Sequence, residues 1–190
     1  MKLVLCGGVQ GVGKTTLLTL LENEFPGRIA TLDPGELFRR YFYENRSKTI
    51  EEIEDLVVDT LKEMPDDVVA IVHWHYAVRR PEGYVPQIAL SRLARLAKSG
   101  KIGQVVLLRV EAPADVVLKR RAKDQEPKKR ALSRPIILEE MAADEQFLAR
   151  HQTLFSEALG SRNVTVFRLL NTELDAARNL LGDFFKSLIE

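Results

Sequence analysis

The chain of 190 residues has little of what marks secreted, disulfide-bonded or membrane-spanning proteins. Its one cysteine, Cys6, excludes an internal disulfide, and in an apolar strand this thiol is expected to pack as a small buried hydrophobe. No apolar run approaches the roughly 20 residues that span a bilayer, and the short apolar start lacks the form of a signal peptide. We therefore expect a cytoplasmic protein with no membrane partner.

An excess of charge of either sign is also missing. There are 28 Lys and Arg residues against 27 Asp and Glu residues, which gives a formal net charge of +1, so no overall field recruits nucleic acid or anionic lipid. The densest basic run, residues 120–130, has no interleaved aromatic residues, and no nucleic-acid partner is expected. That run is interpreted either as a solvated surface or as a lid that folds over phosphates.

Five apolar runs alternate with helical patterns along the chain. Strands are expected at Lys2–Cys6, Arg28–Leu32, Val68–Trp74, Gln104–Val110 and Val164–Leu169. Helices are expected at about Lys14–Phe25, Glu36–Asn45, Ile50–Met64, Gln87–Ser99, Ala114–Lys123, Pro135–Ala158 and Thr172–Leu188. This alternation predicts an α/β fold of three layers, with a parallel sheet covered by helices on both faces. With no internal repeat and no low-complexity linker, a single domain over residues 1–190 is expected.

The strongest motif follows the first predicted strand. Gly8 to Thr15 fits the pattern G-x-x-x-x-G-K-[ST] at every fixed position, between an apolar strand and a helical pattern. Its glycines allow successive backbone N–H groups to converge on phosphate oxygens, and the helix start adds a partial positive charge. Lys14 is expected to reach the β- and γ-phosphates, and the Thr15 hydroxyl to ligate Mg²⁺. The sequence therefore predicts a site for a nucleoside triphosphate.

The ligand crevice of such a sheet lies beyond the carboxyl ends of its strands. Asp33 stands at one of these ends and has two interpretations. It either forms an Asx-type turn that starts the next helix, or presents a carboxylate to the acceptor substrate or to a Mg²⁺-bound water. Asn171 stands at another strand end.

His73 and His75 stand two apart at the end of the third predicted strand, so both are expected to point to one face of it. Two histidines are too few for a zinc site, so they are interpreted as hydrogen-bonded core or acceptor-site residues. A Walker-B aspartate is missing at this position. Arg79 and Arg80 come next, in a loop with proline and glycine, and either clamp a phosphate or lie in solvent.

Three later segments carry a family resemblance. Residues 75–86, HYAVRRPEGYVP, resemble a segment that reads His, three residues, Arg or Lys, Thr, Pro, x, Gly, Tyr, Leu, Pro in the archaeal-type adenylate kinases, which are small P-loop nucleoside-monophosphate kinases. Residues 118–124 resemble the helix end that enters the lid of that family, and Gly35-Glu36 stand where it has Gly-Asp. The chain departs from the family in three places. His73 replaces an aspartate, and the region between the second and third strands is shorter. Lys128-Lys129-Arg130 replaces Arg-x-Arg in the lid.

The resemblance implies a strand order of 2-3-1-4-5, an acceptor-binding helical region at about 34–65 and a short lid at about 124–132. By this match Arg79 would hold the acceptor phosphate, Arg120 or Arg121 would face adenine or phosphates, and Arg130 would come from the lid. The predicted catalytic residues are Lys14, Arg121 and Arg130. The predicted nucleotide-binding residues are Gly8, Gly11, Val12, Gly13, Lys14, Thr15, Thr16, Arg120, Arg121 and Asn171. The predicted acceptor-binding residues are Asp33, Gly35, Glu36, Arg39, His75, Arg79 and Tyr84.

Together these observations predict an enzyme that uses ATP and Mg²⁺ to phosphorylate a nucleoside monophosphate, with AMP as the first choice. Two alternatives stay open. One is a P-loop kinase for a small-molecule hydroxyl, with Asp33 as general base, and the other is a nucleotide-binding regulator or NTPase without an acceptor. ADP formation that depends on one acceptor separates the kinases from the NTPase.

Overall fold

The computed structural model of the chain describes residues 1–124 and 131–189, and its centre is a parallel sheet of five strands. The strands stand in the order β2-β3-β1-β6-β7. Their bounds are β1 Lys2–Gly7, β2 Ile29–Leu32, β3 Val69–His73, β6 Gln104–Glu111 and β7 Val164–Leu170. Counted along the sheet strands alone, this is the predicted order 2-3-1-4-5, so the α/β fold class is confirmed.

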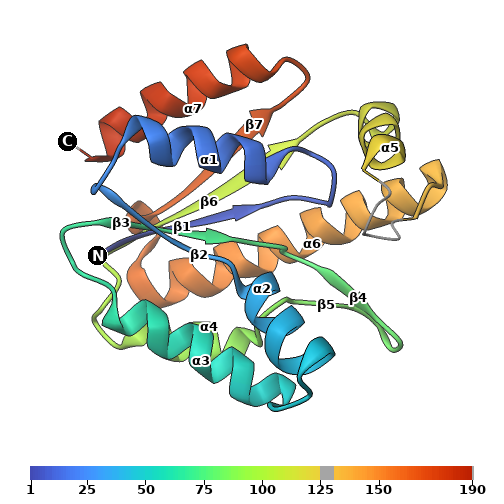
Figure 1. The fold of residues 1–190 in the computed structure, drawn as a ribbon. Helices are drawn as coiled ribbons and strands as arrows, with labels where there is room; N and C mark the ends of the chain where they lie inside the picture. Colours follow the sequence, from blue (N-terminus) through green and yellow to red (C-terminus); the bar gives the residue numbers. More distant parts are fainter. Residues whose placement is uncertain (125–130, 190) are drawn as a thin grey trace.

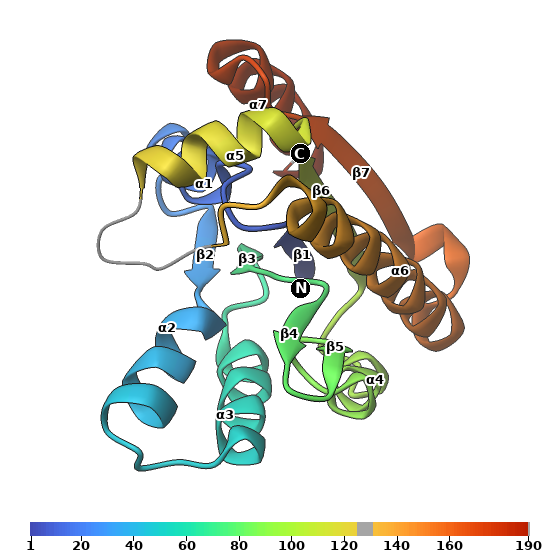
Figure 2. The same cartoon turned by 90° about the vertical axis from the view of Figure 1, so that its right-hand side faces the viewer.

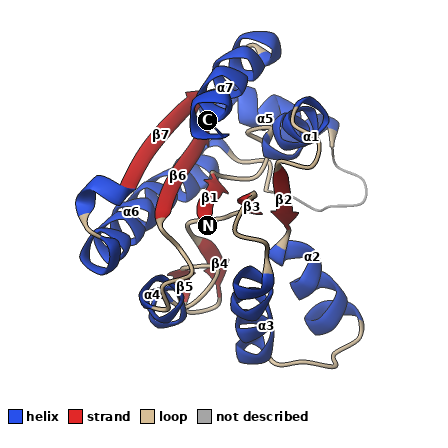
Figure 3. Cartoon of the chain, turned by 90° about the vertical axis from the view of Figure 1, so that its left-hand side faces the viewer, coloured by secondary structure: helices blue, strands red, loops and turns tan. Residues whose placement is uncertain are grey.

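Helices cover both faces of the sheet, which makes three layers (Figure 1). α1 and α7 lie on one face, while α3, α4 and α6 lie on the other (Figures 1 and 3). The helix bounds are α1 Lys14–Glu24, α2 Pro34–Phe38, α3 Ile50–Glu63, α4 Leu90–Lys98, α5 Ala114–Lys123, α6 Arg134–Leu159 and α7 Leu174–Ile189. Among the described residues, none of these helices has the length and apolar character needed to cross a membrane.

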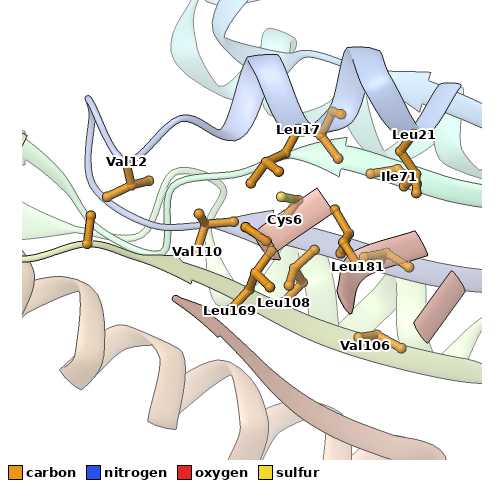
Figure 4. Close-up of a cluster of buried hydrophobic side chains, with 14 of the residues drawn as sticks. Cys6, Val12, Leu17, Leu21, Ile71, Val106, Leu108, Val110, Leu169 and Leu181 are labelled. Carbon is orange, nitrogen blue, oxygen red and sulfur yellow. The ribbon is translucent and has the colours of Figure 1, made fainter. Parts of the chain in front are cut away.

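The core is divided in two by the sheet because side chains alternate along each strand. In β1, Val4 and Cys6 pack towards α1 and α7, in the cluster drawn in Figure 4. Leu3 and Leu5 pack towards α3, α4 and α6. All four side chains have no exposed surface, which explains why the strand reads as a continuous apolar run. Burial raises the pKa of the Cys6 thiol to about 12, in line with the expected role as a buried hydrophobe.

Two segments differ from the expected elements. The predicted loop after β3 contains a two-stranded antiparallel hairpin, β4 Val78–Arg80 with β5 Gly83–Val85. The helix expected at Glu36–Asn45 is instead the short α2 followed by a π-helix, η1, at Arg39–Glu44. The following helix, α3, begins with a capping box: the Glu52 backbone N–H donates to Thr49 Oγ1, and the Thr49 N–H donates to the Glu52 carboxylate.

His151, on α6, is a fully buried histidine beneath the end of β3. Its Nδ1 lies 2.6 Å from the Phe147 carbonyl oxygen, and its ring packs edge-on against Trp74 and Tyr76. Within the described part of the chain, Nε2 has no hydrogen-bond partner. Burial lowers the pKa of His151 from 6.5 to about 4, so the folded protein holds this imidazole neutral.

We expect His151 to make the stability of the fold depend on pH. Because the unfolded chain takes up this proton first, stability is intact above pH 6.5 and falls as the pH drops towards 4. Between pH 7 and pH 5 the free energy of unfolding should fall by about 2 kcal/mol through this group. Urea unfolding of the wild type and of His151→Gln at both pH values measures the effect. An equal change in the two proteins would contradict the assignment to His151.

Candidate functional site

The phosphate loop lies between β1 and α1 at the carboxyl edge of the sheet, as the motif predicts. Its three glycines have positive φ angles, 129° at Gly8, 90° at Gly11 and 93° at Gly13, where side chains with a Cβ are disfavoured. α1 begins directly after Gly13, so the positive end of its dipole faces the loop.

Two of these glycines also have no room for a side chain. A Cβ at Gly8 would lie 2.4 Å from the Val110 carbonyl oxygen, and one at Gly13 would lie 2.4 Å from Asn171 Nδ2. The loop is thus packed against β6 on one side and against the end of β7 on the other. Such close packing holds backbone N–H groups in place before a ligand arrives, which is the cradle that a triphosphate requires.

Lys14 opens α1 and turns its ammonium back over the loop. Its Nζ donates to the Gly8 carbonyl oxygen at 2.5 Å and to the Val9 carbonyl oxygen at 3.2 Å. Only 9 % of the residue is exposed. The ammonium therefore lies at the loop itself, next to the space where bound phosphates would be held.

Thr15 and Thr16, in the first turn of α1, are exposed, while the side chain of the loop residue Val12 is buried. In the part of the chain that the structure describes, no group of three or more His, Cys, Asp or Glu residues could hold a metal ion. A Mg²⁺ ion at this site would therefore depend on the Thr15 hydroxyl, the phosphate oxygens of a nucleotide and water, which is a common way to bind this ion.

Asn171 and Arg120 hold the apex of the loop from two other elements. Asn171 Nδ2 donates to the Val12 carbonyl oxygen at 2.7 Å, and Arg120 Nη1 donates to the same oxygen at 3.1 Å. Arg120 Nη2 in turn donates to the Asn171 carbonyl oxygen at 2.9 Å. The predicted nucleotide-binding residues of α5 and β7 are thus brought to the loop.

Arg121, on α5, also contacts the phosphate loop. It is 1 % exposed, and its Nε donates to the Gln10 carbonyl oxygen at 2.9 Å. Its other two nitrogens donate to the Ala131 carbonyl oxygen and to Glu140. The sequence did not indicate Glu140, which lies on α6 and is paired with Arg121 only by the tertiary fold.

The Asp33 carboxylate at the end of β2 caps α2. Oδ1 accepts hydrogen bonds from the backbone N–H groups of Gly35, at 2.8 Å, and Glu36, at 3.3 Å. This is the Asx-type turn of the first interpretation, and it leaves the second, functional one untested. Glu36 and Arg39 are exposed on α2 and η1. A hollow of about 620 Å³ lies further along, between η1 and the start of α3.

His75 lies beyond the end of β3, which stops at His73, so these two histidines do not share a strand face as expected. The backbone N–H of His75 donates to Gln87 Oε1 at 2.8 Å. Burial, the nearby Lys14 ammonium and His73 lower the pKa of His75 well below its usual value, although the Gly8 backbone raises it. His75 is therefore neutral and lies close to the phosphate loop. Gln87, its partner, had no signal in the sequence.

The hairpin carries Arg79 and Tyr84 as direct cross-strand neighbours. Arg79 is exposed, whereas the Tyr84 hydroxyl is buried. Burial and the carboxylates of Glu139 and Glu140 raise the pKa of Tyr84, while Arg79 lowers it. Tyr84 packs against the buried cluster to which α6 contributes.

Viewed towards the carboxyl ends of the strands, α5 lies near α1 on one side of the sheet, while α2 and the β4–β5 hairpin lie on the other side, separated by α3 (Figure 2). The hydrogen bonds of Arg120 and Asn171 tie the first of these regions to the phosphate loop. Arg130 and most of the predicted lid at about 124–132 lie outside the described residues.

No protein-family model matches the chain. Adenylate kinases from four strains of Saccharolobus islandicus are 26 % identical to it over 196 residues, with 92 % of this chain and 93 % of theirs covered. Among solved structures, a shikimate kinase from Acinetobacter baumannii in complex with shikimate superposes with a TM-score of 0.52, at 18 % identity, over 98 % of this chain and 92 % of that one. An unliganded sugar kinase from Janibacter sp. HTCC2649 gives a TM-score of 0.51, at 15 % identity, over 98 % and 93 %.

The fold is similar to those of a shikimate kinase and a sugar kinase, and the glycine loop of this chain lies between β1 and α1. The resemblance to adenylate kinases is confirmed as a distant similarity that runs over nearly the whole chain. Kinase-type phosphoryl transfer is supported at this level, and the similar proteins differ in their acceptors.

Proposed function

We propose that this chain transfers the γ-phosphoryl group of ATP to a nucleoside monophosphate, with AMP as the first acceptor to test. The match to adenylate kinases carries the proposal, because it covers 92 % of this chain and so extends well beyond the shared glycine loop. The acceptor-binding helical region at about 34–65 and the lid at about 124–132 belong to this proposal.

The loop residues suit the donor side of this reaction. The backbone N–H groups between Gly8 and Lys14 surround the phosphates, and Lys14 supplies positive charge where negative charge develops during transfer. The Thr15 hydroxyl would hold Mg²⁺ together with the nucleotide, and this ion neutralises phosphate charge when it is bound.

On the acceptor side no general base is needed. The second pKa of a phosphate monoester is about 6, so a nucleoside monophosphate arrives ionised and has to be positioned rather than deprotonated. Arg79 on the hairpin and Arg39 on η1 are exposed cations at this end of the molecule and are proposed to contact the acceptor phosphate.

An acceptor screen tests the proposal. Purified protein is incubated with ATP, Mg²⁺ and single acceptors (nucleoside monophosphates, shikimate and simple sugars), and ADP is measured. We expect ADP to form rapidly with AMP or another monophosphate. Rapid ADP formation with an alcohol alone, or slow hydrolysis that no acceptor changes, would overturn the assignment.

A second candidate is a kinase for a small-molecule hydroxyl, and the position of Asp33 favours it. This carboxylate stands at the carboxyl end of β2, and the fold is similar to those of a shikimate kinase and a sugar kinase. An alcohol keeps its proton until transfer, so a carboxylate has to accept that proton.

Asp33→Asn separates the two candidates. Asparagine is as good a helix cap as aspartate, so the bonds to Gly35 and Glu36 should survive while the charge is lost. With a monophosphate acceptor we expect kcat to fall by less than about 10-fold, whereas loss of a general base costs roughly 10²–10⁴-fold. A collapse of kcat with an alcohol acceptor, and no ADP from AMP plus ATP, would establish the second candidate. Asp33→Ser, which also caps, is the matched control for turn geometry.

A further inference from the structure

Arg121 is the most completely enclosed charged side chain at the phosphate loop, with 1 % of the residue exposed. Its stem packs under the loop: a Cβ added to Gly11 would lie 3.1 Å from Arg121 Cγ. Its guanidinium donates from all three nitrogens, to the carbonyl oxygens of Gln10 and Ala131 and to the carboxylate of Glu140. A side chain held in this way supports the loop and uses three of its five N–H donors on protein oxygens.

Glu140, in the second turn of α6, is the counter-charge of this arginine. Its Oε2 lies 2.5 Å from Arg121 Nη2. A guanidinium this deeply buried requires a partner carboxylate, because an unpaired buried charge is strongly destabilising. The planar fork of arginine also means that fixing Nη2 fixes the direction of Nε, which points at the Gln10 carbonyl.

Glu140 lies on α6, which packs against α5, the helix that carries Arg121. The position of this carboxylate is therefore set by the packing of the two helices. Burial, and to a smaller extent the carboxylates of Glu139 and Glu140, also raise the pKa of Tyr84 on the hairpin.

We propose that Glu140 is a positioning residue for the phosphate loop: it orients Arg121, and Arg121 holds the Gln10 carbonyl so that the loop is shaped for a triphosphate before the nucleotide binds. The proposal rests on the nucleotide site of the proposed function and goes beyond it, because Arg121 then acts through the loop and not as a ligand of the phosphates. The opposite arrangement, in which Arg121 leaves Glu140 to bind phosphate, makes Glu140 a competitor of the nucleotide. When the charge of Glu140 is removed, the first arrangement predicts weaker nucleotide binding and the second predicts tighter nucleotide binding.

The test measures binding rather than turnover. Glu140→Gln keeps the shape of the side chain and removes its charge, and we expect it to weaken binding of both ADP and inorganic pyrophosphate by about 10-fold in calorimetry. Since pyrophosphate lacks the base and ribose of ADP, equal losses for the two probes place the defect at the phosphate subsite. KM for ATP should rise in proportion while kcat at saturating ATP changes little.

Asp115→Asn is the matched control, because Asp115 pairs with Arg134 across the same two helices but both side chains are more than half exposed. It should change ADP binding by less than about 2-fold.

Arg121→Lys is the second variant, for use if Glu140→Gln proves too unstable to assay. Lysine keeps the charge but cannot reach three acceptors at once, so this variant should show the same loss of ADP binding. Unchanged or tighter ADP binding in a folded Glu140→Gln protein would overturn the proposal. If the wild type binds ADP but phosphorylates no acceptor, the proposed function fails and this inference stands; if it binds neither probe, both fail.

Discussion

Replacement of Lys14 by alanine is expected to lower kcat by at least about 100-fold, the usual cost of losing a group aimed at developing charge. Lys14 Nζ lies at the Gly8 and Val9 carbonyls, within the loop that is proposed to surround the phosphates. The charge that forms on the transferred group would lose its nearest fixed cation. Steady-state kinetics with ATP and the acceptor found by the screen provide the measurement.

Because Lys14 is only 9 % exposed, alanine also removes packing and the two bonds to loop carbonyls. Lys14→Met keeps most of the volume and removes the charge, so it is the control for a folding defect. We expect the same fall in kcat for both variants, with a thermal midpoint closer to the wild type for methionine. Near-normal turnover of a folded methionine variant would remove Lys14 from the reaction.

Gly8→Ala should lower activity nearly as much as Lys14→Ala, for a steric reason. The φ of 129° is unfavourable for alanine, and the new Cβ would lie 2.4 Å from the Val110 carbonyl oxygen, a backbone atom in the sheet that cannot move aside. The loop has to shift instead, and a displacement of about 1 Å costs on the order of 100-fold in kcat/KM. The thermal midpoint should fall as well.

Gly100→Ala controls for backbone strain alone. Gly100 also has a positive φ, 80°, but nothing lies within 4 Å of its added Cβ. We expect a loss of about 1 kcal/mol in stability with no change in kcat/KM. Equal kinetic losses in the two variants would show that general destabilisation, not the loop, limits the Gly8 variant.

The centre of the sheet was predictable because β1, β3 and β6 are buried on both faces and therefore read as nearly unbroken apolar runs, as in Val4, Leu5 and Cys6. The hairpin was not, because three residues per strand give no periodicity and Arg79-Arg80-Pro81 has the composition of a loop. The π-helix at Arg39–Glu44 was also missed, since its pattern hardly differs from that of an α-helix.

The candidate site also contains residues that the sequence could predict and residues that it could not. The glycine loop and Lys14 were predictable because their chemistry is contained in one short segment. Arg121 was singled out from the sequence, yet its burial and its partner Glu140 depend on how α6 packs against α5, which no local pattern encodes. His75 was expected on a strand, but β3 ends two residues earlier, and Gln87 holds its backbone instead.

The phosphate loop lies near the start of the chain, but the residues that hold it in place are synthesised much later. Its Val12 carbonyl is held by Asn171, 159 positions further along, and by Arg120, 108 positions further along. β1 itself gains its neighbours only when residues 69–73 and 104–109 have joined the sheet. During synthesis the phosphate loop is therefore among the last parts to reach its final shape, so a growing chain carries the loop sequence long before the loop is held in place.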